Sequence, residues 1–291
     1  MSSDTSTTAA EAANTKWSKT ADRYARYFEP CTLVAGRFLL NCMKIVFHTS
    51  STGKGLTIVE GGAGGGALAK ELLQLHGLEL ERLYVTDVSD GMLAKARERL
   101  ATKQDNSNLN VSVEKQDFTN FQFESGSIDR YYANMCLHYA RDPDVVIREA
   151  YRILKPQGIA GFTVWGRPSE SEAFTIVPDV LKELALEEES TTPKRSSFHM
   201  GQDDEAVRKK FFDAGFSRCT CLHYPGVLEC FSAEDFCELI IDGSASTQEQ
   251  ILAMPVDDQL RVRDEVTRRA KVILDQGRPI QLDILIIVAQ K

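Results

Sequence analysis

The sequence predicts an α/β fold in which a doubly wound, mostly parallel sheet of seven strands carries helices on both faces. Three observations predict it: apolar, β-branched segments alternate with helical segments over residues 54–165, a glycine-rich turn follows the first strand, and a strongly apolar segment, 281–290, closes the chain. Right-handed crossovers place the carboxyl ends of parallel strands along one edge, where ligands bind. We therefore expect the functional site at that edge.

The same patterns divide the chain into a tail and one domain. Residues 1–15 are rich in Ser, Thr and Ala without an apolar core, which predicts a disordered tail. The domain spans 16–291, with N-terminal helices at 16–50 and a ligand-binding core at 54–165. Two segments, 166–201 and 227–280, interrupt the alternation and are expected to form a substrate cap.

The individual elements follow from periodicity and from turn residues. Pro30 is expected to end a first helix that starts at residue 16. The expected strands are 56–60, 82–87, 110–115, 128–134, 159–165, 217–224 and 281–290, and the remaining helices are 32–48, 67–75, 90–100, 143–153, 177–186, 203–214, 233–241, 247–253 and 257–274.

The segment Leu56–Ala69 reads LTIVEGGAGGGALA and joins a short strand to an amphipathic helix. Glycine at such a turn permits positive φ angles and lets the backbone approach a ligand closely. From Gly62 the turn matches the dinucleotide pattern G-x-G-x-x-G/A, whereas from Glu60 it reads E-x-G-x-G-x-G. A flexible linker would not lie between a strand and a helix, so the turn predicts a ligand but leaves its identity open.

Composition and charge narrow the possible partners. The chain has 43% hydrophobic and 26% charged residues, which is ordinary for a globular protein, and its net charge of −8 without a basic stripe argues against nucleic acid. Its seven cysteines are an odd number without metal-ligand spacing, so we expect reduced thiols in a cytoplasmic protein and no metal. The sequence contains no run of 18 apolar residues, so no membrane span is expected. The sequence leaves the oligomeric state open.

Acidic residues after the later strands decide between the two interpretations of the glycine turn. Asp87 begins the segment DVSDGML, which resembles the D-x-S-x-x-M-L motif of small-molecule S-adenosylmethionine (SAM) methyltransferases related to the ubiquinone and menaquinone-biosynthesis enzymes. Asp117 follows the third strand like the adenine-site acid of that family. The segments FESGSID and RILKPQG resemble two further motifs, although Ile128 and Gln157 depart from the usual Phe and Gly. With the glycine turn, five motifs in order over residues 17–165 resemble a class I SAM-dependent methyltransferase.

The resemblance implies a Rossmann-like fold with strand order 3-2-1-4-5-7-6 and an antiparallel last strand. It implies SAM as cofactor, with S-adenosylhomocysteine (SAH) as product. Glu60 would lie near the methionine ammonium, Asp87 at the ribose hydroxyls and Asp117 at the adenine. The cofactor-binding residues implied in full are Tyr24, Glu60, Gly61, Gly62, Gly64, Gly66, Asp87, Val88, Met92, Asp117, Phe118, Asn134 and Met135.

His138 is the candidate catalytic residue, because it follows the fourth strand in the segment NMCLHY, which borders the sulfonium in the family. Two interpretations stay open: His138 contacts the acceptor or takes its proton, or it only packs near the cofactor.

The acceptor is expected to be a small molecule methylated on O, N, C or S, because no N/D-P-P-Y/F motif follows the fourth strand. The cap segments contain Phe174, Phe198, Phe231 and Phe236, which predict a partly apolar pocket. Two alternatives stay open: an NAD(P)-binding oxidoreductase, which would need a hydride-site group such as a catalytic Y-x-x-x-K, and a non-catalytic SAM-binding protein.

Overall fold

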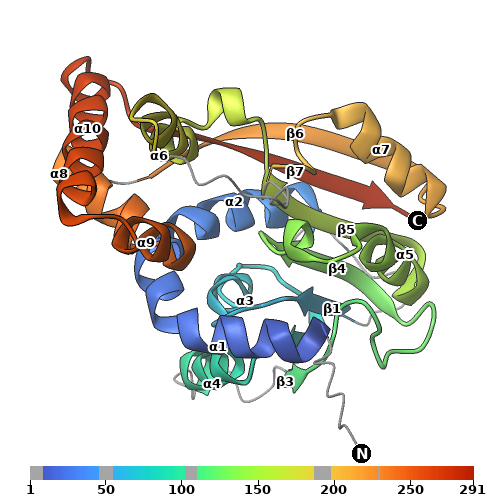
Figure 1. Cartoon of the computed structure of the whole chain (residues 1–291). Helices are drawn as coiled ribbons and strands as arrows, with labels where there is room; N and C mark the ends of the chain where they lie inside the picture. Colours follow the sequence, from blue (N-terminus) through green and yellow to red (C-terminus); the bar gives the residue numbers. More distant parts are fainter. Residues whose placement is uncertain (1–8, 46–54, 102–109, 187–197, 229) are drawn as a thin grey trace, which may run out of the picture.

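The computed structural model describes residues 9–45, 55–101, 110–186, 198–228 and 230–291. Its centre is a seven-stranded sheet with the order β3-β2-β1-β4-β5-β7-β6 (Figure 1). The strand β7 runs antiparallel to both of its neighbours, and the other strands are parallel to one another. The predicted fold class and strand order are thus confirmed. The strands are β1 Leu56–Gly61, β2 Leu80–Asp87, β3 Val111–Lys115, β4 Ile128–Asn134, β5 Leu154–Trp165, β6 Arg218–Val227 and β7 Gln281–Gln290.

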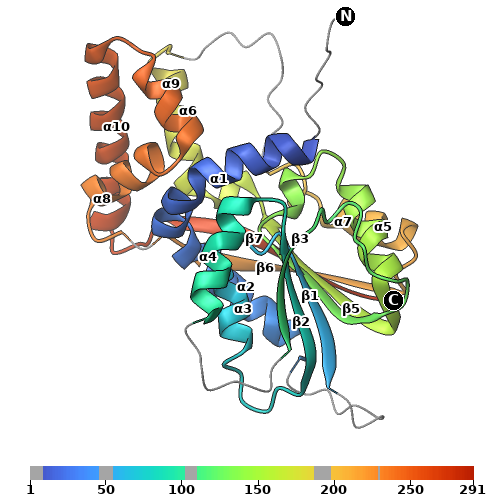
Figure 2. The same cartoon turned by 90° about the horizontal axis from the view of Figure 1, so that it is seen from below.

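Helices cover both faces of the sheet (Figures 1 and 2). The helices α2, α3 and α4 lie on one face and α5 and α7 on the other, while α6 and α8–α10 gather beside β6 and β7. The helices are α1 Ala9–Tyr27, α2 Glu29–Cys42, α3 Ala67–Leu72, α4 Asp90–Ala101, α5 Pro143–Ile153, α6 Glu172–Glu183, α7 Asp204–Asp213, α8 Ala233–Cys237, α9 Ala245–Leu252 and α10 Val256–Asp275, with short turns η1 Leu137–Tyr139, η2 Pro168–Glu170 and η3 Glu238–Asp242.

Two apolar clusters form the core, one on each face of the sheet. Successive side chains of a strand point to opposite faces, and in β1 Ile58 belongs to one cluster and Val59 to the other. The strand β7 reads as a continuous apolar run because it is buried on both faces and paired on both edges. Its residues 284–287 are fully buried, as expected of a strand with neighbours on both sides.

The N-terminal segment differs from the sequence prediction. Residues 9–15, expected within a disordered tail, form the start of α1, and residues 1–8 lie outside the described part of the chain. The side chain of Asn14 donates to Asp90 Oδ2 at 3.0 Å and accepts from the Asp90 backbone N–H at 2.9 Å. The helix is therefore held by contacts with α4, which lies more than seventy residues away in the sequence.

Other boundaries also shift. Pro30, expected to end a helix, lies in the first turn of α2, where proline costs no hydrogen bond. The remainder of the predicted helix 32–48 beyond residue 45 is outside the described residues, as is the acidic run 187–189. The helix expected at 177–186 is α6, which begins five residues earlier, at Glu172.

The helix α1 crosses the sheet at the edge where the parallel strands end (Figure 2). Ser18 Oγ lies 3.0 Å from Ser89 Oγ, and it also accepts from the Gly91 backbone N–H at 3.1 Å. Ala21 is the one buried residue of α1, so polar contacts hold most of this helix against α4. This places α1 over the edge at which the functional site is expected.

Candidate active site

The glycine turn after β1 has the backbone that its sequence predicts. Gly62, Gly64 and Gly66 have φ angles of 63°, 53° and 71°, which favour glycine. A Cβ on Gly62 would lie 2.7 Å from Cys136 Sγ, so a larger residue there would displace the neighbouring segment. The backbone of the turn at Gly62 therefore packs directly against Cys136, which follows β4.

A cavity of about 860 Å³ opens beside this turn. Except for Gly61 and Gly66, all the predicted cofactor-binding residues line it, so the structure gathers side chains from α1, β1, β2, β4 and the loops that follow the strands. The lining residues that were predicted are Tyr24, Glu60, Gly62, Gly64, Asp87, Val88, Met92, Asp117, Phe118, Asn134 and Met135.

Glu60, at the end of β1, is the least solvated acid of this cavity. The residue is 2% exposed, and its Oε2 atom has no hydrogen-bond partner among the described residues. Burial, with a smaller contribution from the nearby Asp87 carboxylate, raises the pKa of this carboxyl from 4.5 to about 8, against the opposing effect of Tyr132 and the Ala69 backbone N–H. The cavity thus presents a buried acid that can accept a hydrogen bond from a ligand.

Asp87, at the end of β2, connects the glycine turn to the sheet. Its Oδ2 atom accepts from the Gly64 backbone N–H at 2.9 Å, and its Oδ1 atom accepts from the Ser89 N–H at 2.8 Å. Burial raises the pKa of this carboxyl, and these backbone N–H groups oppose that shift. The acid therefore shapes the turn and also lines the cavity.

The side chains of Asp117 and Asn134 are also engaged within the protein. Asp117 Oδ1 accepts from the N–H and the hydroxyl of Thr119, at 2.8 and 2.7 Å. Asn134 donates to the Thr32 carbonyl oxygen at 3.1 Å and accepts from Thr163 Oγ1 at 2.6 Å. Met135 follows with a φ of 53°, a conformation that costs a non-glycine residue about 1–2 kcal/mol. The asparagine thus fixes the end of β4 against α2 and β5.

An aromatic wall faces the glycine turn across the cavity. Trp17 of α1 contacts Tyr139 and Tyr24 edge to face, with ring centroids 5.1 and 6.1 Å apart. The Tyr24 hydroxyl lies 3.0 Å from Thr32 Oγ1, and burial raises the pKa of this phenol. Tyr24 is one of the predicted cofactor-binding residues, and Trp17 lines the cavity in contact with it.

Other lining residues were not predicted individually. Cys136 and Tyr139 lie in the segment NMCLHY, which was expected to border the sulfonium, and Ala63 and Gly65 lie in the glycine turn. The remainder come from α1, α2, α3 and the loops that follow the strands, and their position depends on tertiary packing. Glu29 is one of them, and it pairs with Arg99, whose Nη1 atom also donates to the Gly65 carbonyl oxygen at 2.9 Å. The lining residues without a sequence signal are Ala9, Ala10, Ala12, Ala13, Glu29, Thr32, Leu33, Ala67, Leu68, Thr119, Ala140, Arg141, Asp142 and Val145.

His138 lies behind this wall instead of facing the cavity. It is 3% exposed, its ring is 4.2 Å from that of Tyr139 and 6.1 Å from that of Trp165, and it is not among the residues that line the cavity. This placement favours the interpretation in which His138 packs near the site.

The described residues of the two cap segments are not among those that line this cavity. All described residues that line this cavity lie between 9 and 145. Phe174 instead packs against Phe198 and Trp165, Phe236 is fully buried in the core, and Phe231 is 96% exposed. The aromatic residues of the cap thus serve the packing of α6 and α8 or lie on the surface.

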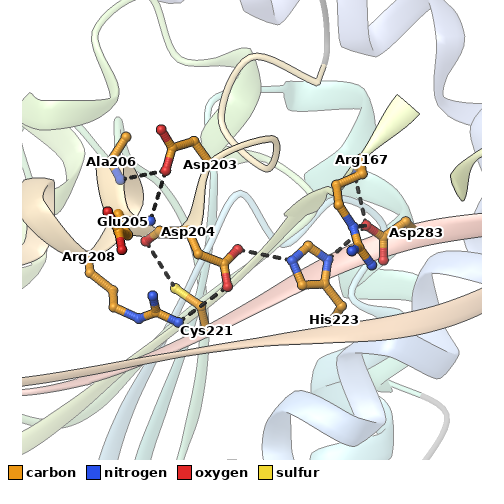
Figure 3. A network of polar contacts seen from close by, with 9 residues as sticks. All are labelled: Arg167, Asp203, Asp204, Glu205, Ala206, Arg208, Cys221, His223 and Asp283. Carbon is orange, nitrogen blue, oxygen red and sulfur yellow. Dashed lines mark hydrogen bonds and ion pairs between the residues drawn. The ribbon is translucent and has the colours of Figure 1, made fainter. Parts of the chain in front are cut away.

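A second polar cluster lies at the β6–β7 side of the sheet (Figure 3). His223 on β6 places Nδ1 2.7 Å from Asp283 Oδ2 and Nε2 2.9 Å from Asp204 Oδ1. The Asp283 carboxylate, 4% exposed, also accepts from the backbone N–H and Nε of Arg167, at 2.7 and 3.0 Å. Both ring nitrogens of His223 are engaged by carboxylates, so His223 offers no free nitrogen that could act as a base. The cluster joins α7, β6, β7 and the end of β5.

Within the described residues, no three His, Cys, Asp or Glu side chains are grouped so as to hold a metal ion. None of the described helices is long and apolar enough to cross a membrane.

A sheet of this order, with a glycine turn after β1 and acids at the ends of β1 and β2 lining one cavity, defines the Rossmann-like methyltransferase class of proteins. Residues 59–162 match the family model described as a methyltransferase domain. This match supports an enzyme, a class I SAM-dependent methyltransferase, and the chain is similar to the ubiquinone and menaquinone-biosynthesis methyltransferases.

Curated relatives and solved structures agree with this assignment. The ubiquinone/menaquinone biosynthesis C-methyltransferase of Coxiella burnetii is 27% identical over 173 residues, which cover 57% of this chain and 68% of the relative. The enzyme of the same name from Neisseria gonorrhoeae is 26% identical over 176 residues, 58% of this chain and 70% of the relative.

Among solved structures, a Haloferax volcanii methyltransferase in complex with the Trm112 activator has a TM-score of 0.54 at 19% identity, with 94% of this chain and 96% of that chain covered. A Haemonchus contortus phosphoethanolamine N-methyltransferase, in complex with phosphomonomethylethanolamine and SAH, has a TM-score of 0.52 at 18% identity, with 94% of this chain and 57% of that chain covered. At these identities the likeness concerns the fold.

Proposed function

We propose that this enzyme transfers the methyl group of SAM to an O, N, C or S atom of a small, partly apolar acceptor. One observation carries the proposal: the buried carboxyl of Glu60 has an oxygen without a partner among the described residues, and it lines the same cavity as Asp87 and the glycine turn. A buried acid of this kind fits a ligand that brings its own cation. The methionine ammonium of SAM is such a cation.

The other lining residues fit the rest of the cofactor. Asp87 would accept from the ribose hydroxyls while it keeps the turn in place. Phe118 and Met92 would cover the adenine, and Asp117 would face the adenine amino group. The glycine backbone would leave room for the methionine chain, and Tyr24 would cover it from α1.

When bound, SAM supplies a methyl group that the adjacent sulfonium already activates. The chain must then align a nucleophile with the S–CH₃ bond and exclude water, and such positioning is worth roughly 7–11 kcal/mol in favourable cases. The helix α1 lies over the carboxyl edge of the sheet and its aromatic residues line the cavity, so it contributes to both tasks.

Among the described residues that line the cavity, there is no histidine or lysine that could remove a proton from the acceptor. Burial raises the pKa of the Cys136 thiol and of the Tyr24 phenol, so both stay protonated near neutral pH. The acceptor we propose therefore carries a nucleophile that reacts without a histidine or lysine base, and His138 acts by packing.

The comparisons support a small acceptor. The curated relatives are named for C-methylation in ubiquinone and menaquinone biosynthesis, and the Haemonchus contortus structure holds phosphomonomethylethanolamine. The net charge of −8 also disfavours a nucleic-acid substrate.

Calorimetric titration with SAH and, separately, with NADH tests the cofactor. We expect SAH to bind and NADH not to bind; binding of NADH alone would contradict the proposal. Release of SAH from SAM, followed with a panel of hydroxylated aromatic, amine and thiol acceptors, would then identify the acceptor class. A protein that binds SAH but turns over no small acceptor would contradict the second half of the proposal.

A further inference from the structure

We propose that Glu60 carries a proton in the free enzyme and that binding of the amino-acid end of SAM or SAH expels it. The inference rests on the proposed function, because it assigns the ligand's ammonium to Glu60. It goes further by stating that cofactor binding is coupled to proton exchange, so that affinity depends on pH.

The position of Glu60 in the sheet accounts for its burial. The residue lies on a central strand, opposite Val85 of β2 on one side and Tyr132 of β4 on the other. It is 2% exposed even though it lines the cavity, so bulk water does not solvate its carboxyl. An ionised carboxylate without solvation or a counter-charge costs several kcal/mol, whereas the protonated form avoids that cost.

Among the described residues, the groups that act on Glu60 include no positive charge. From β2 comes the Asp87 carboxylate, which repels a second negative charge. From β4 comes the Tyr132 phenol, whose own pKa lies well above its usual value because it is buried. The segment after β4 brings the Cys136 thiol, which donates to the Gly61 carbonyl oxygen at 3.4 Å, and α3 brings the Ala69 backbone N–H. Together with burial, these groups place the pKa of Glu60 near 8.

The proton balance then follows from the two titrating partners. At pH 6.5 the free enzyme holds Glu60 as the acid and the free ligand holds an ammonium, so forming the carboxylate–ammonium pair releases about one proton. At pH 9 Glu60 is already largely ionised before the ligand arrives, so pairing with the ammonium releases little proton from it. Proton release is therefore expected to fall away as the pH rises through about 8.

The linkage also sets the dependence of affinity on pH. Below about pH 7 the affinity for SAH is expected to rise close to tenfold for each pH unit, because each unit removes one competing proton from Glu60. The affinity is expected to level off above about pH 8, where Glu60 is ionised before the ligand arrives.

Calorimetric titration with SAH at pH 6.5 and pH 9, in two buffers of different ionisation enthalpy at each pH, measures this exchange from the difference in apparent enthalpy between buffers. We expect release of close to one proton at pH 6.5 and much smaller release at pH 9. The matched ligand is 5′-methylthioadenosine, which keeps the thioether and the nucleoside but lacks the amino-acid end; it should bind more weakly and exchange no proton at pH 6.5.

Two variants locate the proton. Glu60→Gln should bind SAH more weakly and release no proton at pH 6.5, whereas Glu71→Gln, which removes a carboxylate on α3 that pairs with Arg37 outside the cavity, should behave as the wild type. Binding of SAH at pH 6.5 with the same enthalpy in both buffers overturns the inference alone, as does equal proton release by Glu60→Gln. Failure of both SAH and 5′-methylthioadenosine to bind overturns the proposed function, and the inference with it.

Discussion

Replacing Glu60 by glutamine is expected to stabilise the free protein at alkaline pH although the residue lies in the cofactor cavity. The pKa of Glu60 is about 8 in the folded chain, against 4.5 for an unperturbed carboxyl. A difference of about 3.5 pH units, at about 1.4 kcal/mol each, makes a penalty of about 5 kcal/mol. Glutamine cannot ionise, so the variant escapes this penalty.

The sign and the pH window follow from linkage. Below pH 4.5 the carboxyl is protonated in both states and contributes no pH dependence. Between pH 4.5 and 8 the unfolded chain ionises while folded Glu60 holds its proton, so the free energy of unfolding of the wild type falls relative to Glu60→Gln. The difference is expected to be about 2 kcal/mol at pH 6 and about 5 kcal/mol above pH 8.

Guanidinium denaturation of both proteins without ligand, at pH 5, 7 and 8.5, measures this difference. The relevant quantity is its change with pH, since the baseline also contains the packing of the new amide. Glu71→Gln, at a partly exposed ion pair, should show no such change. A stability difference between wild type and Glu60→Gln that stays constant from pH 5 to 8.5 would refute the reasoning, because folded Glu60 would then be ionised like an exposed acid.

Three further predictions concern the turn, the α1 contact and the second polar cluster. Asp87→Asn should lower SAH affinity at least tenfold by calorimetry, because the amide cannot accept both backbone N–H groups that Asp87 holds at 2.9 and 2.8 Å as well as the ribose; unchanged affinity would remove Asp87 from the site. Ser18→Cys with Ser89→Cys should form a disulfide, verified by peptide mapping, that closes a 71-residue separation and stabilises the oxidised protein by about 4 kcal/mol over the reduced one in guanidinium denaturation. No gain on oxidation would mean that α1 does not stay on α4. Asp283→Ala should cost about 3–5 kcal/mol of unfolding free energy, because His223 and Arg167 lose a buried anion; a loss below 1 kcal/mol would contradict that role.

The sequence alone determined the class of fold and the edge that carries the site. Alternating periodicities identify strands and helices from local composition, and parallel strands joined by right-handed crossovers bring their carboxyl ends together whatever the details of packing. For this reason Glu60, Asp87 and Asp117, each placed near the end of a strand, meet in one cavity. The conformation of the glycine turn is also determined by the local sequence, because the positive φ angles at Gly62 and Gly64 depend on the absence of a side chain.

Tertiary structure alone decided what covers that edge and how deeply each group is buried. The helical start of α1 at Ala9 depends on polar contacts with α4, which no local pattern encodes. The strand-end segment around His138 could present its side chains to the cavity or to the core, and packing against Trp165 turned the histidine away. The property that most distinguishes Glu60, a carboxyl without a counter-charge, likewise arises from neighbours on β2 and β4 that only the folded sheet brings together.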